Sequence, residues 1–189
     1  MHSSKGKIRI IAGEYRGRRI AVPDRPGLRP TPDRVRETLF NWLGQSLEGL
    51  SCLDLFAGSG ALGFEAASRG AARVVMVEQD RAAFQALEKS LESLNTRQVE
   101  LVFGDAFAFL KRKETFDVVF LDPPFGQNAL PTVFRQLRPA QGMRVYVEAE
   151  APFTADAGWR ELKRARAGQV SYQLFERRND DQGGLPGNV

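Results

Sequence analysis

Cysteine and histidine are nearly absent from this chain, which has one of each among its 189 residues. The single cysteine, Cys52, cannot form a disulfide within the chain, and no group of cysteines and histidines has the spacing of a metal site. The single histidine is His2, beside the N-terminus, which argues against a histidine-based catalytic triad. We therefore expect no metal cofactor and no histidine base.

Long apolar runs are missing as well. No segment is long and apolar enough to cross a bilayer, and the first residues are polar, unlike a signal peptide. We expect a cytoplasmic protein without membrane association. The 42% hydrophobic and 26% charged residues are typical of a globular domain with a sizeable core.

The net charge of +4 is distributed unevenly. Residues 1–36 contain ten Lys or Arg and three Asp or Glu, a local balance of +7, while the other 153 residues contain 17 basic and 20 acidic ones, a balance of −3. This asymmetry predicts a basic N-terminal arm that binds a polyanion and a slightly acidic body that binds something else. A solvated basic terminus without a partner is the alternative interpretation.

An N-terminal hairpin is predicted by two short apolar stretches on either side of a glycine-containing turn. The two strands are expected over residues 8–12 and 18–22. Arg16, Arg18 and Arg19 gather at the tip of this hairpin, with Tyr15 beside them. Arginine next to an aromatic ring favours phosphate contact together with base stacking.

A helix is predicted after a linker rich in proline and glycine at 23–30. Thr31 is the expected N-cap, and Pro32 the expected first helical residue. The helix is expected to end at Leu43, because Gly44 follows it.

The body alternates strands and helices, which predicts a parallel sheet with right-handed crossovers. The expected strands are 51–56, 73–77, 99–103, 116–121, 144–148, 161–166 and 170–176. Only three residues separate the last two strands, too few for a parallel crossover, so these two strands must be antiparallel. A plain dinucleotide-binding domain has a parallel sixth strand and does not fit this ending.

A glycine-rich turn follows the first strand of the body. Gly58, Gly60 and Gly63 match G-x-G-x-x-G, which on its own is also found in dinucleotide-binding folds. Such a turn lets the backbone approach a ligand and aims helix N-terminal amides at it. Asp54, within the preceding strand, either orients this turn or reaches the amino-acid end of a cofactor, and a purely structural role is an equal alternative.

Acidic residues follow the ends of other parallel strands. Glu78 ends the second strand, with Gln79 next to it, and Asp105 follows the third strand. Ligands of open parallel sheets bind beyond these strand ends. Glu78 is placed to accept both hydroxyl groups of a ribose, and Asp105 to accept from an adenine amino group.

Asp122-Pro123-Pro124-Phe125 ends the fourth strand and is the most specific signal in the chain. The two prolines fix the loop, so that the Asp122 carboxylate and the Pro123 carbonyl can accept both hydrogens of a planar exocyclic amine. These acceptors stabilise the positive charge that develops as the nitrogen attacks a methyl group. Phe125 can stack on the base and set its plane.

Together these residues resemble an S-adenosylmethionine-dependent amino-methyltransferase of class I. Other segments restrict the resemblance to one family within this class. They are Arg9–Gly13, Tyr15–Arg18, Leu28–Thr31, Asp33–Asn41, Gly168-Gln169-Val170 and Tyr172. They resemble the ribosomal small-subunit methyltransferase D family, over about residues 7–178. This family methylates the N2 amino group of one guanine in 16S rRNA.

The resemblance implies a doubly wound, mostly parallel α/β sheet of seven strands in the order 3-2-1-4-5-7-6, with the last strand antiparallel. It implies three segments: an RNA-binding hairpin and helix over 1–44, a methyltransferase domain over 45–178 and a tail over 179–189. The implied partners are S-adenosylmethionine, whose product is S-adenosylhomocysteine, and 16S rRNA or a small-subunit assembly particle, and we expect a monomer.

Residue roles follow from the resemblance by position. The residues implied to hold the target guanine are Asp122, Pro123, Pro124 and Phe125. Those implied for the cofactor are Asp54, Phe56, Gly58, Gly60, Glu78, Gln79, Asp105 and Ala106. Those implied for RNA are Arg16, Arg18, Arg19, Arg29, Thr31, Arg34 and Arg36.

Other functions stay open at this point. Asp-Pro-Pro-Phe binds an amine rather than one particular base, so methylation of adenine or another amine in DNA or protein is the nearest alternative. A nicotinamide-dependent oxidoreductase would use the glycines and Glu78, but it leaves the proline loop and the terminal hairpin without a role. A non-catalytic RNA-binding factor is the third possibility.

Overall fold

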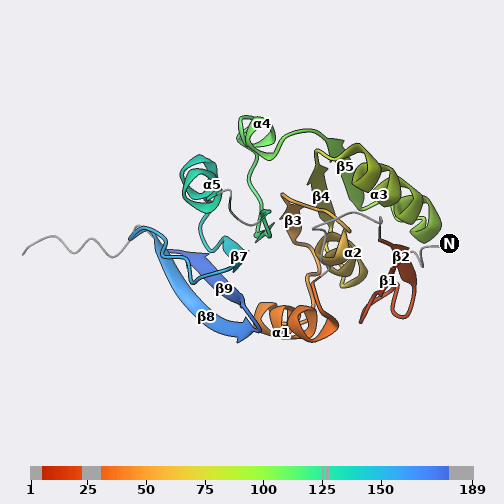
Figure 1. Ribbon diagram of the computed structural model, residues 1–189, viewed down its shortest axis with the longest axis horizontal. Coiled ribbons are helices and arrows are strands. Elements are labelled where there is room, and N and C mark those ends of the chain that lie inside the picture. Colours follow the sequence, from red (N-terminus) through yellow and green to blue (C-terminus); the bar gives the residue numbers. More distant parts are fainter. Residues whose placement is uncertain (1–5, 23–30, 125, 127, 179–189) are drawn as a thin grey trace, which may run out of the picture.

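The computed structural model describes residues 6–22, 31–124, 126 and 128–178. A seven-stranded sheet crosses the molecule, helices lie on both of its faces, and a small hairpin lies beside one helical layer (Figure 1). The strands are β1 Lys7–Arg9, β2 Arg19–Ala21, β3 Ser51–Asp54, β4 Arg73–Glu78, β5 Val99–Phe103, β6 Val118–Leu121, β7 Arg144–Ala149, β8 Trp159–Ala167 and β9 Val170–Arg177. The helices are α1 Asp33–Leu43, α2 Ala61–Ser68, α3 Arg81–Leu94, α4 Ala106–Leu110 and α5 Leu130–Gln136.

The order of strands in the large sheet is β5-β4-β3-β6-β7-β9-β8. The five strands β3 to β7 are parallel, and β9 pairs antiparallel with both β7 and β8. Counted within this sheet, the order is the expected 3-2-1-4-5-7-6 with an antiparallel last strand. The class I methyltransferase topology is therefore confirmed.

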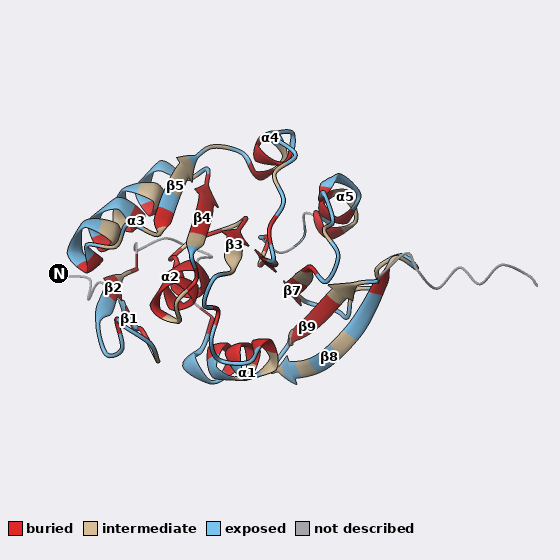
Figure 2. Cartoon of the chain, turned by 180° about the vertical axis from the view of Figure 1, so that it is seen from behind, coloured by how far each residue is buried: buried red, intermediate tan, exposed pale blue. Residues whose placement is uncertain are grey.

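Each face of the sheet has its own hydrophobic cluster. Side chains alternate between the faces of a strand, so Phe120 of β6 joins the cluster under α1, α2 and α3, while Leu121 joins the cluster under α4 and α5. All four residues of β6 are buried because helices cover both faces (Figure 2). The result is a three-layer α/β/α body.

The hairpin of β1 and β2 is antiparallel, as predicted, with Ile8 opposite Ile20. Both isoleucines are buried in the same hydrophobic cluster as α1, α2 and α3. The hairpin thus shares its core with the body, and the division of the chain at residue 44 stays a prediction.

The start of α1 differs from the prediction. Pro32 is the N-cap and has no capping side chain. Thr31 does not cap the helix, because its hydroxyl donates to Glu148 on β7 instead. The predicted end is confirmed, since Gly44 takes the left-handed conformation with φ 97°.

At the far edge of the sheet, β9 is mostly buried, whereas β8 has exposed residues along its length (Figure 2). The predicted antiparallel pairing is confirmed, and the link between the two strands is two residues, Gly168 and Gln169. Trp42 of α1 stacks on Tyr172 of β9 at a centroid distance of 5.3 Å, which ties this end to the α1 layer. No helix within the described ranges is long and apolar enough to span a membrane.

Candidate active site

Three parallel strands place acidic side chains at one edge of the sheet. β4 lies on one side of β3 and β6 on the other, so the strand order reverses between β3 and β6, where open sheets bind ligands. Asp54 is the last residue of β3, Glu78 is the last residue of β4, and Asp122 directly follows β6. The fold thus brings these three predicted residues to the same edge.

The glycine turn after β3 is a fixed backbone platform. Gly58 and Gly60 have φ values of 52° and 79°, which favour glycine. A Cβ at Gly60 would lie 2.6 Å from Leu87 Cδ2, so the surroundings exclude a side chain as well. The amide of Ala57 donates to the Val77 carbonyl at 2.9 Å and ties the turn to β4.

Glu78 is buried and holds the glycine turn. Its Oε2 accepts from the Gly58 amide at 2.8 Å, and its Oε1 accepts from the Asp80 amide at 2.7 Å. A carboxylate oxygen has more than one acceptor site, so Glu78 can still accept from a ligand. The sequence did not indicate this second, structural use of Glu78.

Asp54 is buried beneath the same turn. Its Oδ2 accepts from the Gly63 amide at 3.0 Å, in the first turn of α2. Burial raises the pKa of Asp54 to about 7; the Gly63 hydrogen bond opposes this rise, and the charges of Glu78 and Glu148 add to it. Asp54 therefore orients the glycine turn, which was one of its two predicted roles.

Asp122 and Pro123 open the predicted proline loop, in which Pro123 is buried and Pro124 exposed. Burial, followed by the charges of Glu148 and Asp54, raises the pKa of Asp122 well above its usual value. Phe125 lies outside the described residues.

Glu148 of β7 was not predicted to be a site residue. Leu121 pairs with Val147 in the β6–β7 register, and Asp122 and Glu148 are the next residues of the two chains. Glu148 lies on the same face of β7 as Tyr146, and its charge acts on Asp122. Glu148 Oε1 accepts from the Tyr146 hydroxyl at 2.9 Å and from the Thr31 hydroxyl at 3.1 Å. The sequence contained one indication of this residue, which is that an acidic residue ends the fifth predicted strand.

Three carboxylates thus share one face of one sheet edge. Asp54 of β3 pairs with Phe120 of β6, Asp122 directly follows β6, and Glu148 lies on β7 on the other side of β6. Among the described residues, no lysine or arginine forms an ion pair with any of the three. Acceptors without a basic partner fit a cationic ligand or an amine.

The remaining predicted cofactor residues lie near the ends of β3, β4 and β5. Asp105 caps α4 by accepting from the Ala108 amide at 2.8 Å and is exposed. Gln79 is exposed, Phe56 is half-buried, and Ala106 is buried in the first turn of α4. A role of these residues in binding adenosine stays a prediction.

Comparison with known proteins assigns the chain to a defined family. The family model described as conserved hypothetical protein 95 matches residues 8–176. Ribosomal RNA small subunit methyltransferase D of Escherichia coli (strain K12) is 47% identical over 184 residues, which are 93% of this chain and 93% of that protein. The chain belongs to the ribosomal RNA small subunit methyltransferase D family.

Solved structures agree with this membership. The putative methyltransferase yhhF from Escherichia coli matches with a TM-score of 0.83 at 45% identity, over 91% of this chain and 98% of that one. A putative methyltransferase complexed with SAH matches with a TM-score of 0.60 at 18% identity, over 76% of this chain and 48% of that one, and supports the fold alone. The chain is thus a methyltransferase of the D family, and the oxidoreductase alternative is wrong.

In this methyltransferase, the prediction that Tyr15 stacks on a base needs correction. Tyr15 is 7% exposed, so its ring is packed in the core and is not free to stack on a base. The Arg18 guanidinium donates to the carbonyls of Ser93 and Leu94 at the C-terminus of α3, which gives Arg18 a structural contact. Arg16, Arg18 and Arg19 are all exposed, and their binding of RNA stays a prediction.

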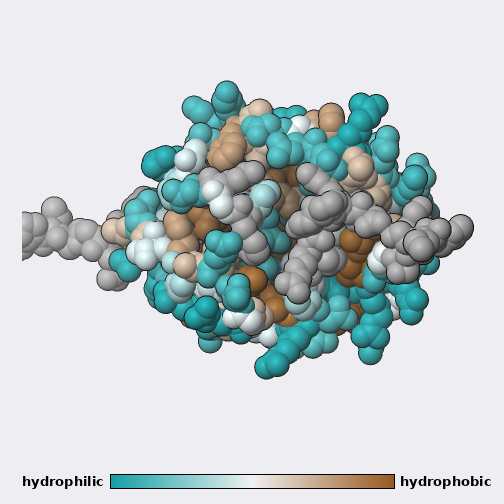
Figure 3. Space-filling view, viewed as in Figure 1, coloured by the Kyte–Doolittle hydropathy of each residue, from teal (hydrophilic) through white to brown (hydrophobic). Residues whose placement is uncertain are grey.

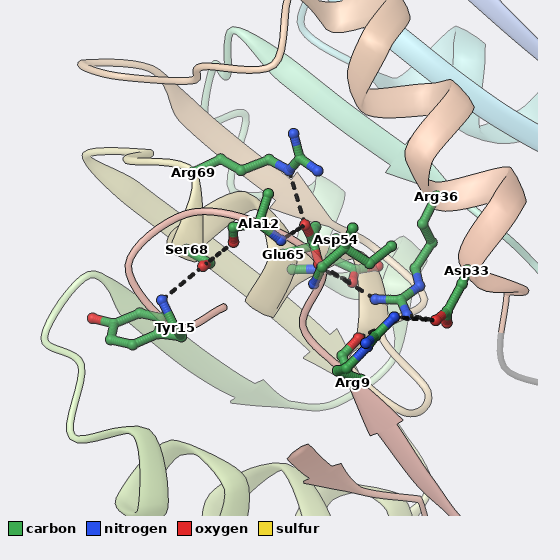
Figure 4. A network of polar contacts seen from close by, with 11 residues as sticks. Arg9, Ala12, Tyr15, Asp33, Arg36, Asp54, Glu65, Ser68 and Arg69 are labelled. Atoms are coloured by element: carbon green, nitrogen blue, oxygen red, sulfur yellow. Dashed lines mark hydrogen bonds and ion pairs between the residues drawn. The ribbon is translucent and has the colours of Figure 1, made fainter. Parts of the chain in front are cut away.

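The predicted contact of Arg36 with RNA also needs correction. Its side chain is fully buried, so direct contact with RNA does not fit. Nη1 lies 3.4 Å from Glu65 Oε2, and Nη2 lies 2.6 Å from Asp33 Oδ1 and donates to the Arg9 carbonyl at 2.9 Å (Figure 4). Arg36 joins β1, α1 and α2.

Glu65 of α2 is the buried centre of this polar network. Its carboxylate accepts from the amides of Ile11 and Ala12 at 2.8 and 3.1 Å, and Arg69 Nε lies 2.9 Å away (Figure 4). Figure 4 also shows Ser68 between Tyr15 and Ala12. The chain after β1 is thus held against α2 by hydrogen bonds to its backbone.

A basic hollow lies beside this network. It has a volume of about 710 Å³. It is lined by Lys7, Ile8, Arg9, Arg19, Thr31, Pro32 and Asp33. Arg34 is exposed on the adjoining helix, and Arg29 lies outside the described residues. Sequence analysis gave no RNA-binding role to Lys7 or Arg9, although both are basic and alternate with buried residues along β1.

Hydrophilic side chains dominate the rim of the face that Figure 3 shows, with hydrophobic groups between them.

Within the described ranges, no three His, Cys, Asp or Glu residues lie close enough to hold a metal ion. Cys52 is buried in β3, and burial raises the pKa of its thiol to about 12, so it is not a reactive thiolate.

Proposed function

We propose that this protein transfers a methyl group from S-adenosylmethionine to the exocyclic N2 of a guanine in 16S rRNA, at the site that corresponds to position 966 in Escherichia coli. The observation that carries the proposal is the set of three carboxylates, Asp54, Asp122 and Glu148, on one face beside the glycine turn. Family membership supports both the reaction and the class of RNA.

The glycine turn and its supports fit the cofactor. S-adenosylmethionine carries a sulfonium and an ammonium group, and carboxylates without a basic partner favour such cations. We assign the methionine part to Asp54, Phe56, Gly58 and Gly60. The remaining predicted residues are assigned to the adenosine part: Glu78, Gln79, Asp105 and Ala106.

The proline loop would hold the target base. Asp122 and the Pro123 carbonyl would accept the two hydrogens of the guanine N2, while Pro124 fixes the loop. Phe125 is proposed, from the motif alone, to stack on the base. The guanine would have to leave its stack to reach this edge of the sheet.

The cofactor supplies an electrophilic methyl group when it is bound. Asp122 would stabilise the positive charge that develops on N2 as the N–C bond forms. The nitrogen then loses one proton, to Asp122 or to water. The raised pKa of Asp122 makes its carboxylate a better proton acceptor than an exposed aspartate.

The basic hollow and the hairpin would hold the RNA backbone. Arg16, Arg19 and Arg34 are exposed, and Lys7 and Arg9 line the hollow. Clustered exposed cations bind phosphates independently of sequence. We propose that the substrate is 16S rRNA or a small-subunit assembly particle, and that the protein is a monomer in the cytoplasm.

The test is to identify the methylated nucleoside. Small-subunit rRNA and its assembly particles, DNA and protein are each incubated with the enzyme and methyl-labelled S-adenosylmethionine, and the labelled product is digested and separated. We expect the label in N2-methylguanosine of 16S rRNA. Label in N6-methyladenosine, in DNA or in protein would instead support the amino-methyltransferase alternative.

A further inference from the structure

Glu148 and Asp122 lie side by side at the carboxyl ends of two neighbouring parallel strands. The register pairs Phe120 with Tyr146 and ends with Leu121 and Val147, so Asp122 and Glu148 are the next residues of the two chains. They lie close enough for the charge of Glu148 to raise the pKa of Asp122. Neighbouring strands are about 4.8 Å apart. Two carboxylates therefore face the same space from adjacent strands, and only one of them belongs to the proline motif.

The two oxygens of Glu148 differ in their surroundings. Oε1 accepts from both Tyr146 and Thr31. Oε2 accepts no hydrogen bond from the described part of the chain. Oε2 is also not fully enclosed by the protein. In the described part of the chain, the fully enclosed side-chain nitrogen and oxygen atoms that lack a hydrogen-bond partner are Arg36 Nε and Ser171 Oγ, and Oε2 is not one of them. One oxygen is thus anchored, and the other is left for a ligand.

The groups that anchor Oε1 favour the carboxylate form of Glu148. Burial raises the pKa of Glu148, but the hydrogen bonds from Tyr146 and Thr31 oppose the rise because they favour the carboxylate. Burial and the neighbouring Glu148 charge also raise the pKa of Tyr146, which therefore remains a donor. Glu148 is only 6% exposed, so these contacts restrict the position of its carboxylate.

We propose that Glu148 is a specificity-determining residue, whose free Oε2 accepts the N1–H of the target guanine while Asp122 accepts from the neighbouring N2 amino group. The proposal rests on the proposed function, because it concerns how the same site selects its base. Guanine presents N1–H and N2–H₂ as adjacent donors, which suits two adjacent carboxylates. Adenine and 2-aminopurine instead have a bare N1 acceptor, which would face the carboxylate without a hydrogen between them.

Selection at N1 explains how the site prefers guanine to adenine, which recognition of the amine alone does not. Asp122 and the Pro123 carbonyl would accept any exocyclic amine, on adenine as well as on guanine. A site that hydrogen-bonds a donor on its substrate strongly rejects an analogue without that donor. Thr31 and Tyr146 are positioning residues in this arrangement, because they act on the base only through Glu148.

The test compares guanine with 2-aminopurine at the target position of the rRNA substrate, using Glu148→Gln and wild type. 2-Aminopurine keeps the N2 amine and lacks the N1 hydrogen. In the variant, the amide oxygen can take the bonds from Thr31 and Tyr146, which leaves an amide N–H at the place of Oε2. We expect wild-type kcat/KM to favour guanine about 100-fold, and this preference to fall at least about tenfold in Glu148→Gln.

Matched measurements separate the possible outcomes. Glu150→Gln changes an exposed carboxylate two residues further on and should keep the wild-type preference. Thermal unfolding and binding of S-adenosylmethionine to Glu148→Gln should stay close to wild type, which shows that the site is intact. A uniform loss of activity on both bases, with the preference unchanged, overturns the assignment of Glu148. Failure of the wild type to methylate N2 of guanine would instead refute the proposed function.

Discussion

At the scale of single residues, the buried carboxyl group of Asp54 makes stability depend on pH. Burial raises its pKa to about 7, from an ordinary value of 3.8. Between these two pH values, the folded protein keeps a proton that the unfolded chain has released. The free energy of unfolding of the ligand-free protein should therefore fall as pH rises from about 4 to 7 and level off above that. The raised pKa values of Asp122 and Glu148 act in the same direction.

The variant Asp54→Asn tests this account. Asparagine cannot ionise, but its carbonyl oxygen can still accept from the Gly63 amide. We expect the fall in unfolding free energy between pH 4.5 and 8 to shrink by about 1–4 kcal/mol, at about 1.4 kcal/mol per unit of pKa shift. Urea unfolding at several pH values, without ligand, measures this. Parallel curves for wild type and variant would show that Asp54 is not the group that titrates.

At the scale of elements, the hairpin of β1 and β2 is fixed to the body by buried charge. Arg36 and Glu65 are both fully buried and pair across α1 and α2, and Glu65 also accepts from two amides after β1. Removing one partner of such a pair typically costs about 3–5 kcal/mol, because the other charge stays buried. The network therefore fixes the position of the exposed hairpin residues that we propose to bind RNA.

The exposed arginines of this hairpin should set the salt dependence of RNA binding. The double variant Arg16→Ala, Arg19→Ala removes two exposed charges and leaves Arg18 on α3 in place. We expect weaker rRNA binding, and a plot of log K against log salt concentration whose slope is about 1–2 units shallower, since each phosphate contact contributes about 0.7–0.9.

The matched control for this variant is Lys111→Ala, Arg135→Ala, which removes two exposed charges at α4 and α5. It changes the net charge equally, and it should leave the slope close to that of wild type. If both double variants change the slope by the same amount, the effect comes from net charge, and the hairpin does not contact the RNA.

At the scale of the whole molecule, the sequence predicted the sheet well because its determinants are local. The predicted gap of three residues between the last two strands, which is two residues between β8 and β9, required antiparallel pairing, and glycines marked the turn after β3, where they have positive φ. Strand ends were predicted to within a few residues. Acidic residues at the ends of parallel strands must meet at one edge, so most of the acidic edge could also be predicted.

The errors come from partners that are distant in the sequence. Thr31 has a cap-like position before α1, yet its hydroxyl bonds to Glu148, 117 residues further on. Arg36 looked like one more exposed cation, but Glu65 on α2 holds it in the core. Tyr15 was expected beside the tip arginines and instead packs in the cluster shared with α2. Local patterns contain no information about such contacts.

The central claim is that the glycine turn after β3 and the proline loop after β6 belong to one active site. The most direct measurement pairs the affinity of Asp122→Ala for S-adenosylmethionine, by calorimetry, with its single-turnover methyl transfer to small-subunit rRNA, using Glu150→Ala as the control. We predict an affinity within about threefold of wild type and a transfer rate lower by about 100-fold or more. Transfer by Asp122→Ala at the wild-type rate would contradict the claim, because the proline loop would then not hold the amine that is methylated.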